Sequence, residues 1–334
     1  MTITIKDVAK MAGVSISTVS RVINDSKPVS EEIKQRVLDV ISETNYKPNP
    51  LARNLVLRKN SFIGVIIPDI SDYKMGELLN GIEEVGKIYE FDILLCNSYG
   101  EPEEEERYID LLINKQVAGI IFVSKNIQKE QIDIINTSKI PSIYISKNAK
   151  DFDIPSVGVN HYKAGEDAAK YILGKGFKKI SLVEAVVEQG TKDSEITAGF
   201  EKALAGKDVL YNKLDITKKG DKVKEAYDFI EDYLKSKQPL PEIFFATGDD
   251  IAAGVINALL DSGIKVPEDI SVIGYDNSRI ATIVRPNLTT VHQPLYDIGA
   301  LAIGVLIKRI SGAEENVENK ILEHKIIERD SVRK

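Results

Sequence analysis

The sequence has few of the residues on which many enzymes and secreted proteins depend. Its 334 residues include one cysteine, Cys96, and three histidines, at positions 161, 292 and 324. A single cysteine excludes an intramolecular disulfide, and its apolar surroundings, FDILLCNS, predict a small buried residue. The histidines are scattered, and no His/Glu pair recurs at i, i+4, so no metal-ligand spacing is present.

Long apolar runs and catalytic signature motifs are also missing. No run approaches the ~20 apolar residues that a membrane-spanning helix needs, and the N-terminus lacks the apolar stretch of a secretory signal. There is neither a Gly-x-Ser-x-Gly elbow nor a Walker loop. We therefore expect a cytoplasmic protein that is not an enzyme, holds no metal or cofactor and has no membrane partner.

Charge is divided unevenly along the chain. The formal net charge is -7. Residues 1–60 nevertheless carry ten Lys/Arg against six Asp/Glu, which gives +4 there and leaves -11 on the remainder. A small basic head on an acidic body hints that the head binds a polyanion.

The first 44 residues have the pattern of three short helices. Thr4 and Asp7 have the spacing of a capping box, and Gly13 is placed to end the first helix in the left-handed conformation. Ser15 or Ile16 opens a second helix, and Ser30 precedes a third. The residues expected to face inward are Val8, Ala9, Ala12, Val19, Val22, Ile23, Ile33, Val37, Leu38, Val40 and Ile41.

The outer face of the second helix is the candidate contact surface. Two short helices joined by a glycine turn form a helix-turn-helix, whose second helix enters the DNA major groove. The small core does not need Ile16, Ser17, Ser20 or Arg21. Hydroxyls can bond to base edges or phosphates, Ile can touch a thymine methyl, and Arg can pair with guanine. The alternative is an ordinary solvated helix face.

The following stretch, NYKPNPLARNLVLRKNS, has two prolines and then apolar residues with no evident core. It is too short to form a stable helix alone. One interpretation is a hinge that becomes helical only when it pairs with its copy on DNA and inserts a leucine into the minor groove. The other is a plain linker.

Residues 4–55 resemble the head of the LacI family of bacterial repressors, through TIKDVAKMAGVSISTVSRVIN and VSEEIKQRVLDVISETNYKPNPLARNL. The resemblance implies a DNA-binding domain at 1–48, a hinge helix at 49–60 and an effector-binding, dimerising core at 61–334. It implies a homodimer on a near-palindromic operator. By position, it assigns base reading to Ile16, Ser17 and Arg21, minor-groove insertion to Leu55, and phosphate or hinge contacts to Thr4, Ser15, Ser20, Asn24, Tyr46 and Asn49. Arg53, a basic residue within the hinge, is a further candidate DNA contact.

The body alternates apolar strands with helical patterns. FIGVIIPDI is a continuous apolar run typical of a buried parallel strand. Two successive sets of strand and helix predict an α/β fold with doubly wound parallel sheets in two lobes, similar to the periplasmic-binding-protein-like core of the family. Ligands in such sheets bind beyond the carboxyl ends of the strands, so Asp69, Asp249 and Asp276 are expected to face the cleft.

Strand-end carboxylates can also form an enzyme's acid–base pair, but no accompanying motif supports that reading. A free solute-binding protein would have the same core, but the head argues against it. Family members that bind sugars or purines have an arginine three residues before the Gly of AGF, and here that position is Ile196. Lys192 could replace the lost anchor only loosely. Control by a small ligand is therefore expected to be weaker than control by a protein.

Two stretches, GVIIPDISDYKMGELLNGIEEV and VRPNLTTVHQPLYDIGALAIGVLIKRI, resemble the catabolite-control branch of the family in Gram-positive bacteria. That resemblance implies serine-phosphorylated HPr as corepressor, with a sugar phosphate as an adjunct effector in the cleft. Tyr296, Asp297 and Lys308 match its contact positions, but Gly304 stands where the branch has an arginine for the phosphoserine. Further candidate contacts are Glu77, Leu78, Gly81 and Ile82. The alternative is an operon-specific, sugar-responsive repressor.

Overall fold

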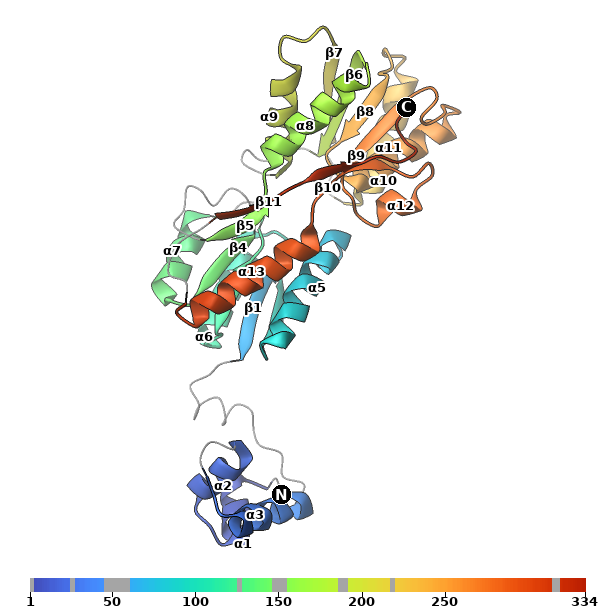
Figure 1. The fold of residues 1–334 in the computed structure, drawn as a ribbon. Coiled ribbons are helices and arrows are strands. Elements are labelled where there is room, and N and C mark those ends of the chain that lie inside the picture. Colours follow the sequence, from blue (N-terminus) through green and yellow to red (C-terminus); the bar gives the residue numbers. More distant parts are fainter. Residues whose placement is uncertain are drawn as a thin grey trace. The chain divides into compact units, whose positions relative to one another are not determined.

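The computed structural model describes residues 3–24, 28–44, 61–124, 128–145, 155–185, 192–216, 220–313 and 319–334, apart from the side chains at 24, 192 and 193. The chain divides into two compact units, Met1–Asn60 and Ser61–Lys334, which we call the head and the body (Figure 1). No helix in these described ranges combines the length and the apolar character that crossing a membrane requires.

The head contains three helices, α1 (Ile5–Ala12), α2 (Ile16–Asn24) and α3 (Glu31–Thr44). Gly13 has φ 66°, the left-handed conformation, and its N–H bonds to the carbonyl of Lys10, so the glycine ends α1 as the sequence predicts. The buried core consists of Val8, Ala9, Ala12, Val19, Val22, Val37 and Val40.

The prediction is wrong for one core residue of the head. Leu38 is 41% exposed, whereas Val37 and Val40 are buried and Ile33 and Ile41 pack partly against them. At 100° per residue, positions 33, 37, 40 and 41 form one stripe of α3, and position 38 falls outside it. The apolar type of Leu38 favours a core position, but its angle around the axis of α3 places it outside the buried stripe.

The first lobe of the body is a parallel sheet with helices on both faces. Strand order is β11-β5-β4-β3-β1-β2. Helices α5 and α13 cover one face, and α6 and α7 cover the other (Figure 1). The elements are β1 (Phe62–Ile67), α5 (Tyr73–Ile88), β2 (Asp92–Asn97), α6 (Pro102–Asn114), β3 (Gly119–Phe122), α7 (Lys129–Ser138), β4 (Ser142–Ile145), β5 (Ser156–Val159), α13 (Leu295–Ile310) and β11 (Asn319–Leu322).

The second lobe repeats this design. Strand order is β12-β10-β9-β8-β6-β7, and only β12 runs antiparallel, against β10. Helices α8 and α9 cover one face, and α10 and α11 cover the other. The elements are α8 (His161–Gly174), β6 (Lys179–Ala185), α9 (Lys192–Leu204), β7 (Leu210–Ile216), α10 (Lys222–Lys235), β8 (Ile243–Ala246), α11 (Asp249–Asp261), β9 (Ser271–Asp276), α12 (Ile280–Ile283), β10 (Thr289–His292) and β12 (Lys325–Ile327). The predicted two-lobed α/β architecture is confirmed.

The lobes are not two successive halves of the chain. In the described residues the chain passes between them after β5, after β10 and after β11, so that α13 and β11 return to the first lobe. His161, His292 and His324 each lie at one of these crossings. His161 Nδ1 lies 2.8 Å from the Tyr275 hydroxyl, and His324 Nε2 lies 3.2 Å from Asp167 Oδ2. Each histidine thus lies in or next to a segment that connects the two lobes.

Candidate functional site

The start of α1 is fixed by the predicted capping box. The Thr4 backbone N–H and hydroxyl donate to Asp7 Oδ2 at 2.9 and 2.6 Å, and the Asp7 N–H donates to Thr4 Oγ1 at 3.4 Å. The hydroxyl of Thr4 holds the pKa of the Asp7 carboxyl below its ordinary value. Thr4 is exposed, so its hydroxyl lies at the head surface where the sequence places a phosphate contact.

The second helix presents a polar and apolar face to solvent. Ser15 begins it, accepting the N–H of Thr18 at 3.1 Å, and its hydroxyl lies 2.7 Å from that of Ser17. Ile16 is 45% exposed, and Ser17 and Arg21 are exposed. A methyl-bearing side chain, a hydroxyl and a guanidinium therefore share the surface that a helix-turn-helix directs into the major groove.

The other residues predicted to bind DNA are either half-buried or outside the described residues. Ser20 is half-buried on α2. The side chain of Asn24, together with Tyr46, Asn49, Arg53 and Leu55, lies outside the described residues. The hinge helix therefore stays a prediction.

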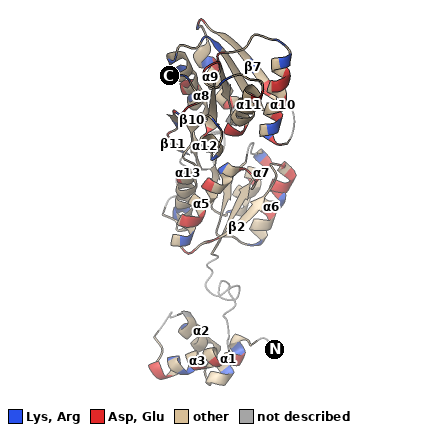
Figure 2. Cartoon of the chain, turned by 90° about the vertical axis from the view of Figure 1, so that its right-hand side faces the viewer, with Lys and Arg blue, Asp and Glu red and all other residues tan. Residues whose placement is uncertain are grey.

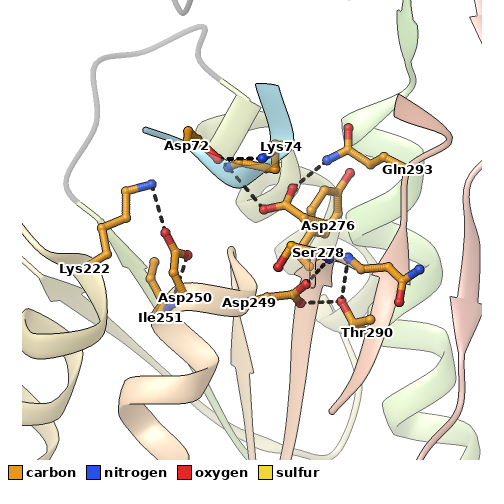
Figure 3. Close-up of polar contacts among 12 residues, drawn as sticks. Asp72, Lys74, Lys222, Asp249, Asp250, Ile251, Asp276, Ser278, Thr290 and Gln293 are labelled. Atoms are coloured by element: carbon orange, nitrogen blue, oxygen red, sulfur yellow. Dashed lines mark hydrogen bonds and ion pairs between the residues drawn. The ribbon is translucent and has the colours of Figure 1, made fainter. Parts of the chain in front are cut away.

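In the body, two of the three strand-end carboxylates lie together in the second lobe (Figure 3). Asp249 begins α11 and is 1% exposed, and Asp276 ends β9 and is 3% exposed. Thr290 Oγ1 and the Ser278 N–H donate to the two Asp249 oxygens, each at 2.6 Å. Burial, and then the charge of Asp276, raise the pKa of Asp249 to about 7.

Asp276 is held from both lobes. Its Oδ1 accepts a hydrogen bond from Gln293 Nε2 at 2.6 Å, and its Oδ2 lies 3.2 Å from Lys74 Nζ. Lys74 belongs to the first turn of α5 in the first lobe and also lies 3.2 Å from Asp72 Oδ2. The lysine supplies the positive charge that two neighbouring buried carboxylates require.

The remaining cleft candidates do not join this cluster in the described contacts. Asp69 Oδ1 accepts the N–H and the hydroxyl of Ser71, at 2.8 and 2.7 Å, within its own loop. Ile196 is fully buried in the core beneath α9, and the side chain of Lys192 is not described. Within the described ranges, no group of three or more His, Cys, Asp or Glu residues is arranged to hold a metal ion.

Three of the proposed corepressor contacts on α5 are buried. Leu78, Gly81 and Ile82 face α13, and a Cβ at Gly81 would lie 2.1 Å from the carbonyl oxygen of Tyr296. The structure therefore places these residues in helix packing and leaves Glu77 as the exposed member of the four. Figure 2 marks acidic positions along α5, where Glu83 and Glu84 are exposed as well.

The proposed contacts on α13 lie at the surface. Tyr296 is 41% exposed and donates to Glu84 Oε2 at 2.6 Å, which ties α13 to α5. Asp297 and Lys308 are exposed. No atom lies within 4 Å of a Cβ built at Gly304, so a side chain there would point into open space. We call the surface that includes the exposed residues Glu77, Tyr296, Asp297 and Lys308 and the half-buried Gly304 the α5–α13 face.

Sequence reasoning missed Lys74, Thr290 and Gln293. The available signal for Lys74 was a lysine two residues after Asp72, a helix-capping residue that follows a buried strand. That places Lys74 at the same strand ends as the predicted carboxylates. Thr290 and Gln293 gave no such signal, because the strand β10 was itself not predicted.

Comparison with known proteins assigns each part of the chain. Residues 4–49 match the family model "Bacterial regulatory proteins, lacI family", and residues 169–332 match "Periplasmic binding protein-like domain". The chain is 38% identical to the HTH-type transcriptional regulator RegA of Clostridium saccharobutylicum, over 99% of both chains. It is 36% identical to catabolite control protein A of Staphylococcus aureus, over 98% of both.

A solved structure agrees with these matches. A LacI-family transcriptional regulator from Silicibacter pomeroyi superposes with a TM-score of 0.86 at 26% identity, and the match covers 99% of this chain and 100% of that one. The similarity thus extends over the head and the body alike.

Proposed function

The chain belongs to the LacI family of bacterial regulatory proteins and is a DNA-binding transcription regulator, and on that premise we propose that it is a cytoplasmic regulator of carbon catabolite control. In this proposal it binds a near-palindromic operator as a homodimer, and serine-phosphorylated HPr stimulates binding. The similarity to catabolite control protein A over nearly the whole chain is the observation that carries the proposal.

The α5–α13 face supports a protein corepressor. It combines an aromatic side chain, Tyr296, with the ammonium of Lys308, and all of its residues come from two helices packed together. Aromatic anchors and cations suit recognition of a protein that carries a phosphoryl group. Because Gly304 offers no cation, Lys308 would carry the phosphate contact.

The mechanism couples this face to the heads. Two heads on a symmetric dimer read two half-sites, and phosphate contacts make the affinity depend on salt. Corepressor binding would bias the relation of the two lobes towards one that lets the paired hinges fold on DNA. Coupling of this kind typically amounts to about 1–3 kcal/mol.

The test is a titration of operator binding with unphosphorylated HPr, serine-phosphorylated HPr and glucose 6-phosphate in parallel. We expect a response to the phosphorylated protein that weakens in Lys308→Ala. A response only to a free sugar, added in a further titration, would reject the proposal and favour the second candidate.

The second candidate is an operon-specific, sugar-responsive repressor. Gly304 favours it, because the face lacks one charge-assisted clamp for a phosphoserine. The buried carboxylates Asp249 and Asp276 could accept hydrogen bonds from sugar hydroxyls if the contacts of Asp276 with Gln293 and Lys74 were broken.

A further inference from the structure

We propose that Lys74 joins the two lobes of the body through its ion pair with Asp276, holding the lobes together without any small molecule. The contact itself does not depend on the proposed function; its consequence for operator binding rests on that function. The side chain of Lys74 reaches from the first lobe to a carboxylate of the second, where Lys74 Nζ lies 3.2 Å from Asp276 Oδ2 (Figure 3). The two side chains are only 16% and 3% exposed.

The first lobe fixes the position of the lysine. Asp72 caps α5, and its Oδ1 accepts the backbone N–H of Lys74 at 3.0 Å. The other oxygen of Asp72 lies 3.2 Å from Lys74 Nζ. One carboxylate thus holds both ends of the residue, so the ammonium is oriented towards the second lobe with little remaining freedom.

The second lobe offers a carboxylate that needs a cation. Asp276 has φ 115°, and the next residue, Asn277, has φ 56°, so the turn after β9 lies in a backbone region that L-residues rarely adopt. This turn directs Asp276 to the lobe boundary, beside the buried Asp249. Two buried carboxylates repel each other, and a buried charge that loses its partner is strongly destabilised. Separation of Lys74 from Asp276 is therefore unfavourable.

The contact also connects the boundary between the lobes to the α5–α13 face. Asp276 bonds to Lys74 at the start of α5 and to Gln293, which lies at the crossing that leads into α13. The two helices then pack backbone to backbone, because Gly81 faces the carbonyl of Tyr296. These contacts connect Lys74, Asp276 and Gln293 to both helices of the pair. A partner that shifts either helix therefore also strains the ion pair between Lys74 and Asp276.

Two consequences follow for regulation. The two lobes keep one relative orientation in the absence of an effector, so operator binding needs no small molecule. A neutral sugar would have to displace an ammonium from a carboxylate whose side chain is only 3% exposed, which selects against sugar control. Control by a protein bound to the α5–α13 face does not require this displacement.

The first test is hydrogen exchange on the full chain without DNA, HPr or sugar. We expect Lys74→Met to increase exchange at least fivefold in peptides covering the first turn of α5 and residues 276–278, while Lys74→Arg stays within twofold of wild type. The matched control is Lys222→Met, which removes a lysine 3.4 Å from Asp250 within the second lobe. Its exchange in those peptides should stay within twofold.

A double-mutant cycle with Asp276→Asn makes the test specific to the pair. In that background Lys74→Met should add less than twofold to the exchange rate, because its partner charge is already gone. Wild-type exchange in Lys74→Met, or full additivity in the cycle, would overturn the proposal. If either lysine variant fails to fold, Asp276→Asn alone must show the fivefold increase for the proposal to stand.

A second readout separates this inference from the proposed function. Operator binding without HPr should weaken at least fivefold in Lys74→Met and not in Lys222→Met. A wild-type chain that prefers no operator would end the proposed function but leave the exchange result intact. Increased exchange with unchanged operator affinity would overturn the regulatory consequence and leave only the structural contact.

Discussion

The head and the body place their functional groups in opposite environments. In the head, Ile16, Ser17 and Arg21 are exposed on a helix whose other side packs a small core. In the body, Asp249 and Asp276 are buried, and their oxygens are bonded to residues from several elements. We therefore expect substitutions on the head surface to change DNA binding with little effect on stability, and substitutions in the body to change stability and regulation together.

The largest expected effect is in the body. Gly81→Ala should lower the free energy of unfolding by about 2–3 kcal/mol, because its Cβ would lie 2.1 Å from the carbonyl of Tyr296 and force α5 and α13 apart. Urea unfolding of the full chain measures this. The control is Gly304→Ala on the same helix pair, where the open space predicts a gain of up to about 1 kcal/mol. Equal effects at both glycines would contradict the packing.

In the head, we expect a substitution to change DNA recognition and to leave stability almost unchanged. Arg21→Ala should remove about 1–3 kcal/mol of discrimination at one operator base pair and change the stability of the head by less than about 0.5 kcal/mol. Competition binding on single-substituted operators measures the discrimination. Arg36→Ala, which removes an exposed charge paired with Glu32 on α3, is the control. If both variants lose affinity equally on every sequence, Arg21 contributes charge alone.

The buried carboxylate makes the stability of the body depend on pH. The folded pKa of Asp249 is raised above its ordinary value, so its protonated form stabilises the fold fully below about pH 4, and this stability is lost as pH rises through about 7. Between pH 5.5 and 8 the wild type should therefore lose about 1–2 kcal/mol relative to Asp249→Asn, which cannot titrate. Urea unfolding at both values measures the difference, and parallel pH profiles would refute the assignment.

The smallest expected effect is a stronger corepressor response, caused by a substitution on the α5–α13 face. Gly304→Arg should strengthen the response to serine-phosphorylated HPr by about 1 kcal/mol, because the guanidinium adds a charge-assisted clamp in open space. Titration of operator binding with the phosphorylated protein measures the change. Gly304→Gln, which adds length without charge, should show no gain, and a gain with unphosphorylated HPr would point to another docking mode.

Local elements could be read from the chain with good accuracy. The capping box of Thr4 and Asp7 and the glycine stop at Gly13 follow from residues within one turn of each other, and the structure confirms both. The buried Cys96 is also confirmed, at 5% exposed, and burial raises the pKa of its thiol. Such features depend on neighbours in sequence, which periodicity and residue type reveal.

Other features depended on partners far along the chain. Glu105 lies in the acidic first turn of α6, yet it is 1% exposed and accepts a hydrogen bond from Gln131 at 3.0 Å. The returning strand β11 pairs with β5 across more than 150 residues, and neither it nor β12 was predicted. Their short, partly exposed patterns give no strong alternation to detect.

The sequence by itself determined the helix-turn-helix and the strand-end carboxylates, because each follows from hydrophobic period and turn chemistry within a single segment. The two-lobed α/β class followed from the alternation of strands and helices along the body, together with the resemblance to the family. Only the tertiary structure decided that Lys74 meets Asp276, that α13 returns to the first lobe, and that Leu78, Gly81 and Ile82 are buried. These features arise where chain crossings bring distant segments together. A side chain carries no mark of its distant partner, so only the packed fold reveals the pair.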